Sequence, residues 1–136
     1  MTLKIRELND SDYEDILVGW WKDWGWEPPQ KDLLPDDGKG GIIIYDGDVP
    51  ICAGFMYLSN SKLAWVEWIV SNKRYTNRIL RKDAMTLLVS RLTEICKLVG
   101  CKYVYALIKH PNLINTYEGL GYIKGDSYTS EMIKVL

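Results

Sequence analysis

The sequence is poor in the residues that build metal sites and disulfides. It has one histidine, and its three cysteines (Cys52, Cys96 and Cys101) include no CxxC pair. An odd number of separated cysteines fits reduced thiols better than a disulfide framework. Because a zinc-type site needs about four such ligands, we expect no metal site.

Long apolar runs are also absent. No stretch reaches the roughly 18 residues that a membrane-spanning helix requires, and no signal-like run opens the chain. The formal net charge is −1, so the chain as a whole attracts neither nucleic acid nor an anionic membrane. These features predict a cytoplasmic protein without a membrane partner, and they make nucleic acid the weakest candidate partner.

What is present is the balance of a globular domain. Hydrophobic residues make up 47% of the 136 residues and charged residues 26%, which is typical of chains that fold around a core. A chain of this length is long enough for one such domain and too short for two ordinary ones. Residues 1–136 are therefore predicted to form a single domain.

Hydrophobic periodicity predicts a mixed α/β fold with the element order β-α-β-β-β-α-β-α-β-β. Strands are expected at residues 3–8, 41–45, 50–59, 64–70, 102–108, 122–124 and 128–136, and helices at 13–24, 79–99 and 113–120. The second helix carries one apolar stripe, formed by Leu80, Ala84, Leu87, Leu88, Leu92, Ile95 and Val99. Because this helix joins two strands, the strand at 102–108 should lie parallel to the strand at 64–70.

A basic loop lies between the strand at 64–70 and that helix. Five of the ten residues from 73 to 82 are cationic: Lys73, Arg74, Arg78, Arg81 and Lys82. Since a helix N-terminus presents unpaired N–H groups and partial positive charge, this arrangement suits a phosphate. The alternative is an exposed loop whose charges are simply solvated. Glu67 favours a functional use, because a lone acid in a strand of tryptophan and β-branched residues is costly.

The element order and the sequence TYEGLGY at residues 116–122 resemble the GCN5-related N-acetyltransferase (GNAT) family. The resemblance covers nearly the whole chain and implies that acetyl-CoA binds where the fourth and fifth strands separate. Its pyrophosphate would lie on the turn into the following helix. The tryptophan-rich N-terminal part and the loop DLLPDDGKGG resemble small acetyltransferase-like proteins of bacteriophages, which implies the cytoplasm of a bacterial or phage-infected host cell.

The sequence departs from the family at the pyrophosphate loop, whose pattern is Gln/Arg-x-x-Gly-x-Gly/Ala. No glycine occurs between Gly54 and Gly100, and the pattern places Ile79 at the Gln/Arg position and Lys82 at the middle glycine. Either the backbone still donates to the phosphates with ordinary dihedral angles, or arginine and lysine side chains replace it as charge-assisted donors. The cofactor contacts implied by the resemblance are Ile69, Val70, Arg78, Arg81, Lys82, Asp83, Ala84 and Asn112.

Two residues are candidates for the proton transfers that acetyl transfer to an amine requires. Glu67, on the strand that lines the cleft, suits the base that removes a proton from the ammonium group. Tyr117 stands at the family position for the acid that protonates the departing thiolate, and backbone N–H groups near Ile69 or Val70 would meet the oxyanion. The structural alternatives are an ion pair or an exposed face for Glu67 and a core-packed ring for Tyr117. A β-bulge would change the face to which Glu67 points.

The resemblance places the acceptor site at the first helix and the loop after it. Trp26, just past that helix, and Tyr57 are the candidates for contact with the amine, whose identity the sequence leaves open. His110 is a second candidate base, and a loop-facing polar role is its alternative. A homodimer is also left open. The alternative to an enzyme is a catalytically inactive protein of the same fold that binds a host protein or nucleic acid.

Overall fold

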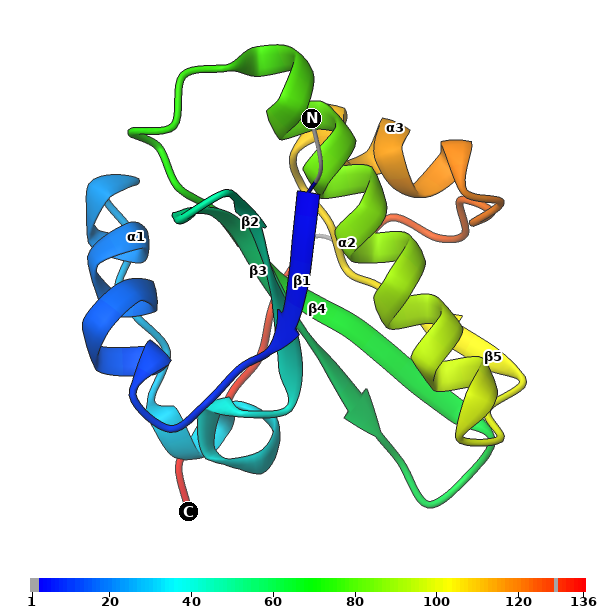
Figure 1. Cartoon of the computed structure of the whole chain (residues 1–136). Coiled ribbons are helices and arrows are strands. Elements are labelled where there is room, and N and C mark those ends of the chain that lie inside the picture. Colours follow the sequence, from blue (N-terminus) through cyan, green and yellow to red (C-terminus); the bar gives the residue numbers. More distant parts are fainter. Residues whose placement is uncertain (1–2, 129) are drawn as a thin grey trace.

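The computed structural model describes residues 3–128 and 130–136. Five strands form one sheet in the order β1-β2-β3-β4-β5 (Figure 1). The first four strands are antiparallel neighbours, and β5 runs parallel to β4, which confirms the predicted pairing across the long helix. The strands are β1 (Leu3–Glu7), β2 (Gly41–Asp46), β3 (Val49–Leu58), β4 (Leu63–Ser71) and β5 (Tyr103–Tyr105).

Helices cover both faces of this sheet (Figure 1). A cluster of buried apolar side chains lies under each layer of helices. α1 packs on one face, α2 packs on the other, and α3 lies beside α2. No helix among the described residues is both long and apolar enough to cross a membrane. The helical elements are η1 (a π-helical turn, Tyr13–Leu17), α1 (Val18–Asp23), the 3-10 turns η2 (Lys31–Leu33) and η3 (Pro35–Gly38), α2 (Arg78–Leu98) and α3 (Pro111–Gly119).

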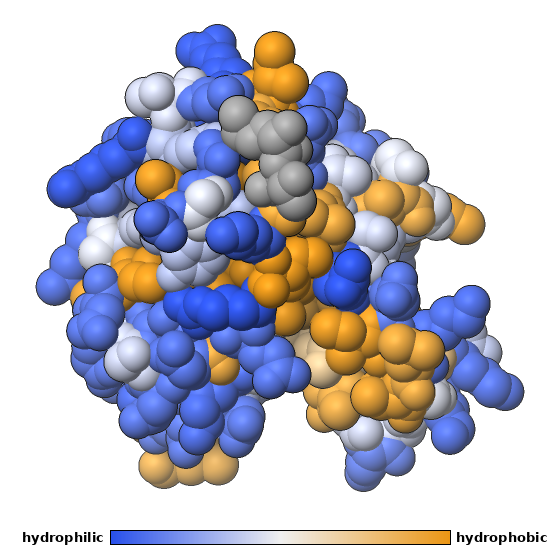
Figure 2. Space-filling model, in the orientation of Figure 1, coloured by the Kyte–Doolittle hydropathy of each residue, from blue (hydrophilic) through white to orange (hydrophobic). Residues whose placement is uncertain are grey.

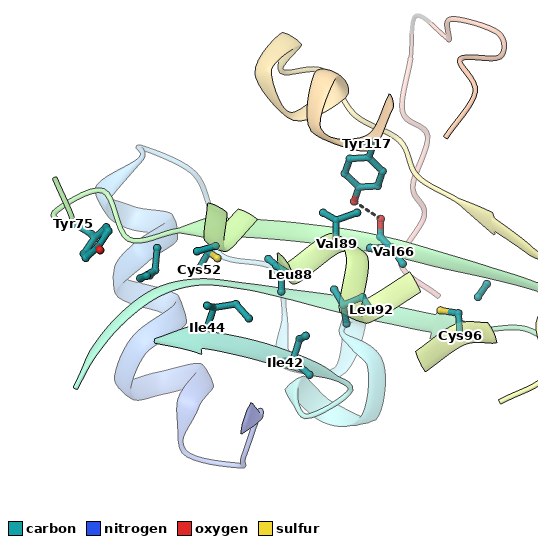
Figure 3. Close-up of a cluster of buried hydrophobic side chains, with 13 residues drawn as sticks. Ile42, Ile44, Cys52, Val66, Tyr75, Leu88, Val89, Leu92, Cys96 and Tyr117 are labelled. Atoms are coloured by element: carbon teal, nitrogen blue, oxygen red, sulfur yellow. Dashed lines mark hydrogen bonds between the residues drawn. The ribbon is translucent and has the colours of Figure 1, made fainter. Parts of the chain in front are cut away.

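The long helix α2 supplies the central part of the larger cluster. Figure 3 shows Leu88 and Leu92 beside Ile42 and Ile44 of β2, and all four side chains are buried. The predicted stripe is wrong at its end, because the helix stops at Leu98 and Val99 is 56% exposed. The side chains of α2 that are buried are Ala84, Leu88, Val89, Leu92 and Cys96.

Replacing Leu88 by alanine is expected to lower the free energy of unfolding by about 2–5 kcal/mol, because the side chain is completely buried and leaves a cavity. Ile79→Ala is the matched control, since Ile79 is 77% exposed in the first turn of the same helix and should cost about 0.5 kcal/mol or less. Urea denaturation of both variants measures the difference. A Leu88→Ala loss no larger than that of the control would contradict this packing.

The C-terminal part differs from the sequence prediction. Strands were expected at 122–124 and 128–136, but the described residues of the tail, 122–128 and 130–136, contain no strand; residue 129 lies outside the described residues. The strand expected at 102–108 is also shorter, since β5 ends at Tyr105. A strand needs a neighbour to complete its hydrogen bonds, and β5 offers an edge of three residues. The alternating apolar residues of the tail thus stay exposed, including Ile123, Met132 and Val135.

Candidate active site

The candidate site begins where β4 and β5 part. Their parallel pairing extends only from Leu63 opposite Tyr103 to Trp65 opposite Tyr105. β4 continues to Ser71, whereas the chain after Tyr105 leaves the sheet and leads to α3. Beyond Trp65, β4 therefore has no strand partner on that side among the described residues. The opening lies at the C-terminal ends of two parallel strands.

A β-bulge in β4 sets the directions of the side chains at this opening. Ala53 pairs with Val70 and Phe55 pairs with Glu67, so β4 takes three steps where β3 takes two. Trp68 absorbs the extra residue with a positive φ of 56°. A bulge of this kind interrupts the alternation of a strand. Glu67, opposite the buried Phe55, and Trp68 thus both point to the face of the sheet that carries α1.

The carboxylate of Glu67 spans the opening from β4 to the chain after β5. Its Oε1 atom accepts a hydrogen bond from the backbone N–H of Leu107. Burial raises the pKa of Glu67 to about 7; the Leu107 hydrogen bond lowers this pKa, and the negative charge of Glu131 raises it further. Glu67 is therefore a carboxylate that changes protonation near neutral pH, which is the range a general base needs.

The raised pKa of Glu67 predicts a pH-dependent cost to stability. The unfolded chain releases this proton near the ordinary value of 4.5 and the folded chain near 7, so the folded state binds more protons between these values. Stability contributed by the protonated carboxyl is full below pH 4.5 and falls as the pH rises through 7. Glu67→Gln removes the titration and is expected to be more stable than the wild type at pH 8, by about 1–2 kcal/mol after discounting for partial exposure.

Urea denaturation of the wild type and of Glu67→Gln at pH 4 and pH 8 tests this expectation. The difference between the two proteins should be small at pH 4 and grow with pH, and Glu118→Gln, an exposed glutamate on α3, should show no such growth. A constant difference across the range would mean that the pKa of Glu67 is not raised in the folded state.

Tyr117, on α3, reaches the same opening from the other face of the sheet. Its side chain is 2% exposed, and its hydroxyl donates a hydrogen bond of 3.0 Å to the backbone carbonyl of Val66 on β4 (Figure 3). Burial raises the pKa of Tyr117, and the charges of Tyr122 and Glu67 raise it further. The phenol is therefore protonated at neutral pH.

The sequence TYEGLGY fixes the ring of Tyr117 by turning the chain back on it. α3 ends at Gly119, and Gly121 follows with a φ of +94°, a conformation that favours glycine. The backbone N–H of Tyr122 then donates to the carbonyl of Tyr117 at 3.1 Å, and the two rings meet edge to face at 4.8 Å. The hydroxyl of Tyr122 forms a hydrogen bond with the hydroxyl of Thr93 on α2, away from the opening.

The basic loop between β4 and α2 divides its cations among three roles. Lys73 donates to the backbone carbonyl of Asp23, at the end of α1, and Arg74 donates to the Asp23 carboxylate, each at 3.3 Å. The guanidinium of Arg81 turns inward, where its Nη2 atom donates to the backbone carbonyls of Asn72, at 3.2 Å, and of Tyr75. Arg78 and Lys82 are exposed. They are four residues apart and so lie on one face of the first helical turns. Arg81 therefore holds the loop, and Arg78 and Lys82 are the two cations presented to solvent there.

The other predicted cofactor contacts surround the same region with different exposure. Asp83 is exposed on α2 beside Lys82, whereas Ala84 is fully buried against the sheet. Asn112 is exposed in the first turn of α3, and its backbone N–H donates to Nδ1 of His110 at 3.2 Å. His110 is thus the N-cap of α3, which matches the polar structural role considered for it.

A pocket of about 550 Å³ lies on the α1 face, next to the bulge. Tyr57, a predicted substrate contact, lines it, and the hydroxyl of Tyr57 donates to the carbonyl of Leu33 at 3.1 Å. Trp26 is not among the lining residues; it is 52% exposed and stacks on Trp24 with ring centroids 5.7 Å apart. The pocket is lined by Glu27, Pro28, Pro29, Gln30, Leu33, Tyr57, Trp68, Glu131, Met132 and Ile133.

The sequence prediction missed most of this pocket. Strand alternation turns Trp68 away from Glu67, and only the bulge brings both residues to one face. Glu131 was assigned to a strand, and it instead lines the pocket as part of the irregular tail. The only sign of a bulge in the sequence is that β4 has one apolar residue more than regular alternation needs, and this does not reveal at which residue the bulge lies.

No protein-family model matches the sequence, and no curated protein matches it. Solved structures do match. Glucosamine-6-phosphate N-acetyltransferase from Arabidopsis thaliana has a TM-score of 0.67 and 18% identity, over 98% of this chain and 100% of that one. An aminoglycoside acetyltransferase from an uncultured soil metagenomic sample has a TM-score of 0.68 and 10% identity, over 98% of this chain and 96% of that one.

A third match is named after the family itself. It is a GNAT family acetyltransferase from Staphylococcus aureus, with a TM-score of 0.60 and 16% identity, over 98% of this chain and 100% of that one. The chain therefore has the fold of the GNAT acetyltransferases, which confirms the fold class predicted from its sequence. At these identities the likeness is one of fold.

Proposed function

We propose that the protein is an acetyl-CoA-dependent N-acetyltransferase. The observation that carries the proposal is the opening beyond Trp65, where the carboxylate of Glu67 and the phenol of Tyr117 flank the same stretch of β4 from opposite faces on an acetyltransferase fold. Among the described residues neither group has a cation as its partner, so no ion pair there accounts for Glu67. Glu67 can accept a proton near neutral pH, and Tyr117 carries one there.

Glu67 acts as the base in this proposal. An amine is mostly protonated at neutral pH and becomes a nucleophile only after it loses a proton. With a pKa of about 7, the carboxylate of Glu67 is substantially ionised at that pH and basic enough to accept a proton directly or through one water molecule. The Leu107 hydrogen bond to Oε1 orients the group and leaves Oε2 for the proton.

Tyr117 holds the proton for the leaving thiolate. Its hydroxyl proton now lies on the bond to the Val66 carbonyl, at the edge of β4 that has no strand partner. Rotation of the hydroxyl is enough to redirect the proton into the opening, because the ring is fixed by Tyr122. The backbone N–H groups at Ile69 and Val70 follow the bulge and are the proposed donors to the oxyanion.

The residues at the N-terminus of α2 fit the pyrophosphate of acetyl-CoA, which when bound supplies the acetyl thioester. Arg78 and Lys82 are exposed donors with full positive charge, and Arg81 keeps the loop in place by its bonds to backbone carbonyls. Asp83 and Ala84 belong to the same helical turn. Asn112 at the start of α3 is the proposed contact on the opposite side of the opening.

Changing Arg78 and Lys82 together to glutamine is expected to weaken acetyl-CoA binding by about 10-fold or more, since two charge-assisted contacts are lost. S-acetylpantetheine has the same thioester and no phosphate, so its binding should be unaffected. Isothermal titration calorimetry with both ligands measures the two effects. Arg91 and Lys97, exposed further along α2, supply the matched control when both are changed to glutamine. Equal losses for the two ligands would contradict a phosphate contact.

The direct test of the function is release of free thiol from acetyl-CoA in the presence of a panel of primary amines. Activity that depends on both substrates supports the enzyme. The glycine-free loop favours a second candidate, an inactive protein of this fold that binds a host protein or nucleic acid. Wild-type protein that does not bind acetyl-CoA in calorimetry would exclude the enzyme and leave this second candidate.

A further inference from the structure

The pocket of about 550 Å³ beside the bulge has a composition that selects a class of ligand. We propose that it takes a small primary amine with a flat apolar body, such as an arylalkylamine, as the acceptor for acetyl transfer. This inference rests on the proposed function, and it concerns the ligand class alone. It follows from the charge, the apolar walls and the size of the pocket.

The charge of the lining is entirely acidic. Glu27 and Glu131 contribute carboxylates, and no lysine, arginine or histidine is among the described lining residues. Glu131 lies close enough to Glu67 for its negative charge to raise the pKa of Glu67. Carboxylates from the loop after α1, from the tail and from β4 thus surround one region, and a cationic head relieves their mutual repulsion.

The remaining walls suit a flat apolar body. Trp68 is held edge-on to Trp21, with centroids 6.3 Å apart and planes at 84°, and is 36% exposed. Tyr57 is anchored through its hydroxyl to Leu33, so its orientation is fixed as well. Aromatic faces attract both apolar groups and organic cations. Pro28, Pro29, Met132 and Ile133 complete the apolar lining.

The size and charge of this pocket do not suit the substrates in the names of two structural neighbours, a sugar phosphate and an aminoglycoside. A volume of about 550 Å³ lies in the range of small-molecule sites. A sugar phosphate needs a cationic partner for its phosphate, and this lining offers none among its described residues. A polyhydroxylated amine needs many polar partners, whereas Gln30 is the one neutral polar side-chain amide here.

The position of the pocket connects it to the chemistry. Trp68 follows Glu67 in the chain, and the bulge turns both side chains to the α1 face. An amine whose apolar body rests on Trp68 therefore lies next to the carboxylate that would remove its proton. In Figure 2 the surface is indented between the part of the molecule around η2 and η3 and the β3–β4 hairpin, and the pocket has walls from both parts.

Calorimetry with four probes of known charge tests the ligand class. Phenethylamine is expected to bind at least about 10-fold more tightly than 3-phenylpropionate, which has the same ring and the opposite charge. Phenethyl alcohol should fall between them, and glucosamine 6-phosphate should not bind measurably. Equal binding of phenethylamine and 3-phenylpropionate, or preferential binding of glucosamine 6-phosphate, would overturn the proposal.

The Glu131→Gln variant tests whether the ammonium group of the ligand binds in this pocket. Glu131 is exposed in the tail, so its replacement leaves the core intact, and it should weaken phenethylamine about 3- to 10-fold while leaving phenethyl alcohol unchanged. Glu94→Gln, an exposed change on α2, is the control and should alter neither. An unchanged affinity for phenethylamine in Glu131→Gln would overturn the assignment to this pocket.

Thiol release separates this inference from the proposed function. Acetyl transfer to glucosamine 6-phosphate but not to phenethylamine would leave the enzyme intact and overturn the acceptor class. Selective binding of phenethylamine without any thiol release from acetyl-CoA would support the pocket's ligand class and count against the enzyme.

Discussion

Replacing Tyr117 by phenylalanine is expected to lower kcat for acetyl transfer by about 10²- to 10⁴-fold, the usual contribution of a general acid. The ring stays in its edge-to-face contact with Tyr122, so only the proton donor is lost. Affinity for acetyl-CoA should be nearly unchanged, because the hydroxyl is bonded to Val66 and not placed among the phosphate contacts. Thiol release and calorimetry on the same preparation separate kcat from binding.

Tyr122→Phe is the matched control for this variant. It removes the hydroxyl of the neighbouring tyrosine, which is bonded to Thr93 and lies away from the opening. Both changes cost one hydrogen bond, worth about 1 kcal/mol of stability, so their folding defects should be similar. A kcat loss of the same size in both variants would show that Tyr117 supports the fold rather than transfers a proton.

Replacing Glu67 by glutamine is expected to lower kcat/KM at pH 7 by about 10²- to 10³-fold, since the base is removed and its geometry kept. In the wild type the rate should rise as Glu67 ionises around pH 7, because burial raises the pKa of its carboxyl to about 7. The variant lacks that step, and its deficit should shrink at high pH as the amine loses its proton unaided. Rates measured from pH 5.5 to 10 with one amine give both profiles.

Glu118→Gln is the control, because Glu118 is exposed on α3 next to Tyr117 in the chain and outside the opening. Its profile should follow that of the wild type at every pH. If the deficit of Glu67→Gln were the same at pH 10 as at pH 7, the carboxylate would be acting on something other than the proton of the amine.

Much of the fold follows from patterns that are local in the sequence. The periodic leucines of α2 and the apolar strands on either side specify a crossover, and a crossover of that length makes β5 parallel to β4. The tail could not be read in the same way. Its alternation between apolar and polar residues resembles a strand, but a strand also needs a partner edge, and the length of β5 is a property of the folded sheet.

The candidate site also has features that the sequence shows and features that only the folded chain shows. Glu67 and Tyr117 were identifiable as candidates because an isolated acid in an apolar strand and a tyrosine before a Gly-aromatic pair are visible in the sequence. The inward direction of Arg81 was not, since all five cations of the loop look alike until the loop carbonyls that bind one of them are in place. Long-range contacts decide that choice.

The bulge at Trp68 reverses which residues of β4 face which side of the sheet: even-numbered residues face α2 before the bulge, and odd-numbered residues do so after it. Ala64 and Val66 belong to the buried cluster under α2, and so does Ile69, whereas Val70 belongs to the cluster under α1. Any comparison of β4 with another sheet that proceeds by counting alternate residues will therefore be out of phase after Glu67. Homologous positions on either side of the bulge must be matched separately. Deleting Trp68 would remove the extra residue and let β4 alternate regularly, with Ile69 and Val70 still on their present faces, so the bulge residue can be lost without reversing the rest of the strand.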